Sequence, residues 1–208
     1  MSRVLALVML LASAAPAGAD KLKWNGLFDA AVGVSIPVGD SNYNRFADPT
    51  FKLSLRGGAE IWLTNRFAVA PELALDFIPV KTDDGTFRPA GAGIDTSFFR
   101  FRVLAGARLL WNLGICALFA RFGIGLDYIT GSERASILGL NINLNLSSTA
   151  FTLEPGVGVQ FHFLKYGIAG GTLGFPVAFH NFNKNDAANN SAFTAVDLDI
   201  LAFAGARI

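Results

Sequence analysis

The sequence contains one cysteine and, beyond its first twenty residues, no long apolar run, and each shortage excludes a class of structure. Cys116 has no second cysteine to pair with, so a disulfide-stapled scaffold is excluded. No uninterrupted apolar stretch after residue 20 approaches the roughly 20 residues that a membrane helix needs. Charged residues are also scarce, at 16% of the chain, whereas they make up about a quarter of soluble domains.

The chain begins with the three parts of an export signal. Arg3 supplies a positive charge, residues 4–15 an apolar segment, and Ala17-Gly18-Ala19 a small-x-small cleavage site. We therefore expect a signal peptide over residues 1–19 and one domain over residues 20–208. The 17 Lys and Arg nearly balance the 16 Asp and Glu, which leaves no basic footprint for nucleic acid.

Two-residue alternation is what the sequence has in abundance. Hydrophobic residues make up 52% of the chain, and in residues 22–38 most of them share one parity while the charges fall on the other. Successive side chains of a strand point to opposite faces, so this pattern predicts a strand with one uncharged face. Seven more stretches follow the same rule: 51–63, 67–77, 99–111, 118–128, 151–163, 170–180 and 196–208.

The connections between these strands alternate in length. Short ones lie at 64–66, 112–115 and 164–167, and long polar ones at 39–50, 81–95, 131–148 and 181–192. Outer-membrane barrels have short periplasmic turns and longer extracellular loops. The sequence thus predicts an all-β fold, an eight-stranded antiparallel up-and-down transmembrane β-barrel, with no metal or cofactor.

A soluble barrel, apolar inside and charged outside, is the alternative. Aromatic residues near both ends of the apolar faces favour the membrane barrel, because such girdles mark the two membrane interfaces. The girdle near the short turns comprises Trp24, Phe67, Trp111 and Phe163, and the one near the long loops Phe51, Phe77, Phe99, Tyr128, Phe151 and Phe179.

Two segments carry a family resemblance. Residues 56–73, RGGAEIWLTNRFAVAPEL, resemble a hairpin of the small bacterial outer-membrane barrels related to OmpX and the OmpA membrane domain, and residues 121–128 resemble their central strands. The resemblance implies a cell outer-membrane location of Gram-negative type. It also implies contact with outer-membrane lipid, lipopolysaccharide and the barrel-assembly machinery. The chain departs from the family by ending in Ile208 rather than an aromatic residue.

The polar faces should fill the lumen with paired charges, because an eight-stranded barrel is only wide enough for side chains. Eight bases (Lys23, Lys52, Arg56, Arg100, Arg102, Arg108, Arg121, Arg207) face eight acids (Asp29, Glu60, Glu72, Asp76, Asp127, Glu154, Asp197, Asp199). Counting from the turn at Asn65 puts Arg56 beside Asp76 and Glu60 beside Glu72. Arg108 and Arg121 would neutralise the two glutamates. We expect a salt-bridged plug; a gate or an acid/base site is the alternative.

No catalytic constellation is evident, and we expect a protein that is not an enzyme. His162 and His180 are predicted at opposite ends of the barrel and so cannot share a metal. No serine follows His180 closely. The glycine-rich run 170–174 precedes no helix, so it is not a phosphate loop.

Specific function is expected in the long loops, where binding residues concentrate. In residues 131–148 an apolar series alternates with Asn, Gly and Ser: Leu138, Leu140, Ile142, Leu144 and Leu146. Its parity is opposite to that of the next strand, which predicts a bulge between Ser147 and Ala150. The series is a candidate site for an extracellular partner strand or lipopolysaccharide, or else a wall extension paired with its neighbour.

The function predicted from these features is a non-catalytic outer-membrane protein for envelope integrity, surface interaction or adhesion. A narrow porin-like channel or apolar-ligand transporter is the second possibility, and a lipid-A-modifying enzyme the third.

Overall fold

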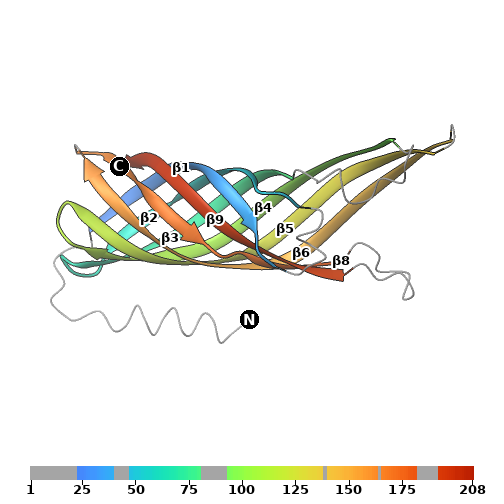
Figure 1. Ribbon diagram of the computed structural model, residues 1–208. Helices are drawn as coiled ribbons and strands as arrows, with labels where there is room; N and C mark the ends of the chain where they lie inside the picture. Colours follow the sequence, from blue (N-terminus) through green and yellow to red (C-terminus); the bar gives the residue numbers. More distant parts are fainter. Residues whose placement is uncertain (1–22, 40–46, 81–92, 138–139, 164, 182–191) are drawn as a thin grey trace, which may run out of the picture.

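A computed structural model describes the chain from residue 23 to residue 208, except residues 40–46, 81–92, 138–139, 164 and 182–191 (Figure 1). The predicted signal peptide lies outside the described residues. The strands are β1 (Lys23–Pro37), β2 (Thr50–Trp62), β3 (Phe67–Val80), β4 (Gly93–Asn112), β5 (Cys116–Ile137), β6 (Leu140–Phe163), β7 (Gly167–Gly174), β8 (Val177–Asn181) and β9 (Ala192–Arg207). In the described part of the chain, no helix is long and apolar enough to cross a membrane.

The strands form a closed barrel in which neighbours are antiparallel and β9 pairs back with β1. A line of paired residues that leaves β1 at Trp24 returns to it at Val34, ten residues farther along. On the way it passes through Ile61, Val69, Leu109, Ala120, Val157, Leu173 and Ile200. Such a stagger requires the strands to tilt against the barrel axis, as Figure 1 shows.

The strands β7 and β8 together make the seventh strand of an eight-stranded barrel. Both pair with β6 and with β9 in unchanged register, so no residue is inserted between them. The interruption falls at Phe175-Pro176, where proline offers no backbone N–H. Around it Phe175 N still donates to Pro155 O, and Asp197 N donates to Pro176 O at 3.1 Å. The predicted count of eight strands is therefore confirmed.

The outer wall is apolar and the lumen is polar, which excludes the soluble-barrel alternative. The large exposed side chains of the wall are Phe, Leu, Val, Ile, Trp and Tyr, and they include predicted girdle residues at both ends, such as Trp24 and Phe179. In the short-turn girdle, the rings of Phe67 and Trp111 stack with centroids 6.4 Å apart. Charged side chains of the opposite parity are buried inside.

The predicted third long loop, residues 131–148, is instead largely strand. The β5–β6 ladder continues from Cys116↔Phe161 to Ile137↔Leu140 in one unbroken register. The predicted bulge between Ser147 and Ala150 is therefore wrong, because Ser147 to Ala150 pair regularly with Asp127 to Thr130. Figure 1 shows β4, β5 and β6 projecting beyond the rest of the barrel at the end opposite the short turns.

Candidate functional site

The lumen holds buried charges along most of its length. Among the residues whose burial the structure describes, eight acids are buried (Asp29, Glu60, Glu72, Asp76, Asp127, Glu154, Asp197, Asp199), but six bases (Lys52, Arg56, Arg100, Arg102, Arg108, Arg121). Arg207 is half-buried, and Lys23 is exposed at the short-turn end. The predicted balance of eight against eight is thus wrong for the interior, because Lys23 lies at the rim where its strand begins.

The charges nearer the short turns form what we call the short-turn cluster: Asp29, Arg56, Glu72, Arg108 and Arg121. Arg108 and Arg121 are cross-strand partners, so their like charges need an anion between them. Glu72 supplies it, since its carboxylate accepts from Arg108 Nε at 2.5 Å and from Arg121 Nε. Asp29 joins Arg108 Nη2 at 2.7 Å to Arg56 Nε at 2.5 Å.

Two inward aromatic rings complete the short-turn cluster. The guanidinium of Arg56 lies 5.0 Å from the ring centroid of Phe203, and that of Arg108 lies 5.4 Å from that of Phe119. Each ring lies against a wall glycine, Gly158 for Phe119 and Gly170 for Phe203, where a Cβ atom would overlap it. Ring faces attract these cations and fill the lumen around them.

The charges nearer the long loops form what we call the long-loop cluster: Lys52, Asp76, Arg100, Arg102, Asp127, Glu154, Asp197 and Asp199. Arg102 lies within 3.5 Å of all five carboxylates. Lys52 Nζ lies 2.6 Å from both Asp76 and Asp199. With five acids and three bases, this cluster carries an excess of negative charge.

One residue joins the two clusters into a continuous plug. Arg121 donates through Nε to Glu72 of the short-turn cluster. It also donates through Nη1 to Glu154 of the long-loop cluster, and so links the two. Paired buried charges of this kind are held by mutual hydrogen bonds rather than by water.

The structure brings together Glu72, Arg108 and Arg121, and it separates Glu60 from them. Glu60 Oε2 instead contacts Trp62 Nε1 at 3.2 Å and Arg207 Nη1 at 3.4 Å. The predicted neighbours were wrong by two residues: Asp76 pairs across the sheet with Ser54, not with Arg56. The predicted pairs imply a register centred on Arg66, whereas the observed register is centred on Asn65, with Leu63 N donating to Phe67 O.

A serine, a histidine and an acid meet at the long-loop end, a grouping that the sequence analysis missed. His180 Nδ1 lies 3.2 Å from Ser148 Oγ, and His180 Nε2 lies 3.6 Å from Asp127 Oδ1. Ser148 and His180 share inward parity on adjacent strands, and this is the signal that would have found them. Asp127 is already engaged by Arg100 and Arg102, and Ser148 is 5% exposed. The arrangement therefore lacks the tight relay and the open nucleophile of a catalytic triad.

The two histidines lie at opposite ends of the barrel, as predicted. His162 pairs with Ile168 beside a short turn, 3.1 Å from Gln160 Nε2, whereas His180 pairs with Phe193 near the long loops. Among the described residues, no three His, Cys, Asp or Glu side chains are grouped to hold a metal.

The candidate partner-binding series lies only partly within the described residues. Leu138 is outside them, and Leu140, Ile142, Leu144 and Leu146 belong to β6, whose backbone pairs with β5.

No family model matches the chain, and no curated protein matches it by sequence. Among solved structures it is similar to a major outer-membrane protein of Thermus thermophilus, with 15% identity and a TM-score of 0.57, over 89% of this chain and all of that one. It is also similar to the attachment invasion locus protein Ail of Yersinia pestis (15% identity, TM-score 0.49, 89% of this chain and 99% of that one). OprG of Pseudomonas aeruginosa matches with 13% identity and a TM-score of 0.44, over 89% and 94% of the two chains.

The chain therefore has the fold of the small outer-membrane β-barrels. The resemblance seen in residues 56–73 and 121–128 is confirmed at the level of the fold, where the same closed eight-stranded barrel is found.

Proposed function

We propose that the protein is an integral outer-membrane protein that acts without catalysis, by surface interaction or adhesion through the projecting sheet of β4, β5 and β6. The apolar wall supports the membrane location, because the buried charges face a closed lumen and hydrocarbon can contact the apolar outer face. In the orientation usual for such barrels, the short turns face the periplasm and the projecting sheet faces outward.

The observation that carries the proposal is the difference in strand pairing at the long-loop end. Pairing of β3 with β4 ends at Val80↔Phe98, while β4 continues along β5 to Gly93↔Ser136. On the other side, β8 pairs with β6 only as far as Thr152↔Ala178. In the described part of the chain, residues 140–147 of β6 thus have strand pairing with β5 alone. Such an edge can accept an added strand.

The plugged lumen favours this role over the channel and transporter alternatives. Both clusters cross the interior, and Arg121 joins them. A lumen closed by paired side chains should pass almost no ions, so planar-bilayer conductance of the refolded protein should stay at the baseline. A steady single-channel current from wild-type protein would favour the channel alternative.

The test of the proposed function shortens the projecting hairpin without changing its register. Residues 134–143 are excised and Glu133 is joined to Leu144 through Asn-Gly, a dipeptide that closes two-residue hairpins. Gram-negative cells displaying each form are then bound to surfaces coated with fibronectin, laminin or lipopolysaccharide.

We expect wild-type cells to bind at least one of these surfaces and the shortened form to lose most of that binding. A matched control deletes residues 183–190, which leaves the sequence of the β5–β6 hairpin intact, and it should bind like wild type. Equal binding by the shortened hairpin, or binding to none of the surfaces by wild type, would overturn the proposal.

A further inference from the structure

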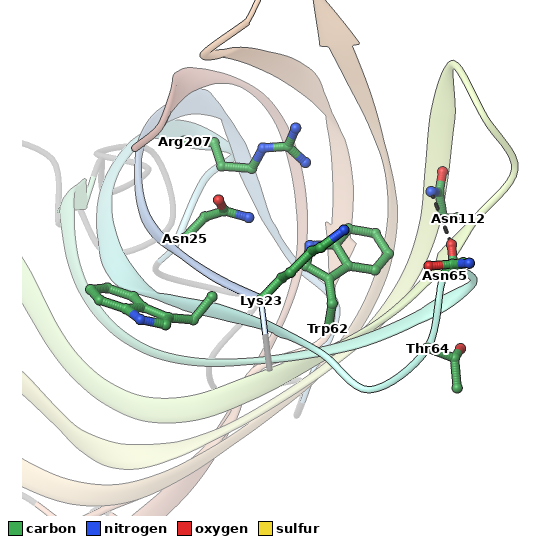
Figure 2. A pocket seen from close by; sticks show the side chains of 8 residues that line it. Lys23, Asn25, Trp62, Thr64, Asn65, Asn112 and Arg207 are labelled. Carbon is green, nitrogen blue, oxygen red and sulfur yellow. Dashed lines mark hydrogen bonds between the residues drawn. The ribbon is translucent and has the colours of Figure 1, made fainter. Parts of the chain in front are cut away.

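At the short-turn end, the lumen opens into a cavity of about 620 Å³ outside both charge clusters. Figure 2 shows Lys23, Asn25, Trp62 and Arg207 within the ring of strands, with Asn65 and Asn112 on the neighbouring turns. Asn112 Nδ2 donates to Asn65 O at 3.4 Å, which fixes those two turns to each other. The lining therefore combines two cations, three amides, a threonine hydroxyl and two indoles, those of Trp24 and Trp62.

Three of the side chains that line this cavity contact one buried carboxylate, that of Glu60. Glu60 Oε2 is contacted by Asn25 Nδ2 at 3.4 Å, Trp62 Nε1 at 3.2 Å and Arg207 Nη1 at 3.4 Å. These contacts hold the indole, the amide and the guanidinium in fixed positions at the mouth. Trp62 also packs against the buried apolar residues of the lumen, so its ring is supported from below.

Electrostatics at this end favour an anion. Lys23, Arg66, Lys165 and Arg207 are all at least partly exposed here, and Glu60, the acidic side chain that contacts Arg207, is fully buried. The Arg207 side chain is 27% exposed, and its single ion pair with Glu60 is long. The rest of its planar fork can therefore bind a carboxylate in the bidentate geometry that arginine prefers.

We propose that this cavity binds an acidic amino-sugar glycan through its carboxylate. Arg207 and Lys23 would bind the carboxylate, the face of Trp62 would contact the apolar C–H face of a sugar ring, and Asn25 and Asn112 would bond hydroxyl or N-acetyl groups. Asn25, Trp62 and Arg207 of the lining belong to the lumen side of the strand ring, and Trp24 belongs to the outer girdle. The indole faces and the amides suit the ring and the hydroxyl groups of a glycan better than a lipid phosphate. The inference rests on the proposed function in one respect, that this end faces the periplasm.

The binding test uses the full-length protein refolded in neutral detergent micelles. Isothermal titration measures binding of the disaccharide N-acetylglucosaminyl-N-acetylmuramic acid, which carries one carboxylate. Chitobiose has the same rings without the carboxylate, and acetate has the carboxylate without a ring. We expect the acidic disaccharide to bind at least about tenfold more tightly than either, because charge-assisted bonds and ring contact must act together.

Variants locate the site. Arg207→Gln should weaken binding of the acidic disaccharide about tenfold or more, and Lys23→Gln should weaken it by a smaller factor. Lys165→Gln is the matched control, because Lys165 is an exposed rim base that lies against Tyr166, outside the cavity. Circular dichroism verifies that each variant is folded, and Lys23→Gln tests the site independently if Arg207→Gln does not refold.

Three outcomes would overturn the inference. If Lys165→Gln lost as much affinity for the disaccharide as the cavity variants, the overall positive charge of the rim, and not the cavity, would cause the binding. Chitobiose binding as tightly as the acidic disaccharide would remove the role of the carboxylate. Displacement of the disaccharide by micelles doped with phosphatidylglycerol would favour a lipid phosphate. Because the measurement uses purified protein, its failure and a failure of the adhesion test are distinguishable.

Discussion

The two charge clusters of the lumen are built on opposite balances. The short-turn cluster has three bases and two acids, and two aromatic rings face its guanidinium groups. The long-loop cluster has three bases and five acids, and Oδ1 of Asp76 and of Asp199 has no hydrogen-bond partner among the described residues. One cluster thus has a surplus of cations and the other a surplus of carboxylates.

The contribution of a buried charged side chain to stability depends on which sign of charge is scarce in its cluster. A surplus guanidinium can lie over a ring, as Arg56 does over Phe203 while its two Nη atoms make no hydrogen bond among the described residues. A surplus carboxylate has no comparable apolar partner. The scarce group in each cluster should therefore be the costly one to remove, because its loss leaves buried charges uncompensated.

The largest effect is expected for Arg102→Met, which removes the central base of the long-loop cluster. Five carboxylates within 3.5 Å would lose a shared counter-charge. Breaking a buried ion-pair network by deleting one partner costs about 3–5 kcal/mol. Urea unfolding of the refolded protein in micelles would measure the loss in free energy of unfolding.

The control for this variant is Arg66→Met, because Arg66 is exposed on a short turn. It should change the free energy of unfolding by no more than about 0.5 kcal/mol. If Arg102→Met unfolded at the same urea concentration as Arg66→Met, the stability of the protein would not depend on the central base of the long-loop cluster.

The sequence was sufficient to predict the barrel because the strand repeat is two residues and every strand has one uncharged face. The alternation did not predict the strands that are formed by polar residues. Residues 131–148 are rich in Asn, Gly and Ser, a composition that predicts a loop, yet residues 131–137 continue β5 and residues 140–148 continue β6, paired with each other. Backbone hydrogen bonds to a neighbour, rather than side-chain pattern, decide such a segment.

The lumen residues were predictable by parity, but their partners were not. A shift in the turn centre of one residue moves each cross-strand partner by two, which is why Asp76 was assigned to Arg56. The actual partners often come from strands that are not neighbours, as in Asp29 of β1 with Arg108 of β4 and Arg100 of β4 with Asp197 of β9. These pairs depend on barrel closure and stagger, which only the complete pairing defines.

An intermediate effect is expected for Glu72→Gln in the short-turn cluster, where acids are scarce. Its carboxylate separates Arg108 from Arg121, so its neutralisation should cost about 3 kcal/mol. Arg56→Met removes a surplus base from the same cluster and should cost only about 1 kcal/mol, since Asp29 keeps Arg108 at 2.7 Å. The same urea titrations measure both, and a larger loss for Arg56→Met would reverse the proposed balance.

The smallest effect is expected for Asp76→Asn, the matched counterpart of Glu72→Gln. Both variants neutralise one buried carboxylate with an amide of the same shape, but Asp76 belongs to the cluster that has a surplus of acids. Lys52 would keep Asp199 at 2.6 Å, and repulsion among the remaining carboxylates would fall. We therefore expect a change within about 1 kcal/mol of zero, of either sign. A loss equal to that of Glu72→Gln would show that local contacts, rather than the charge balance of each cluster, set the energetics of the plug.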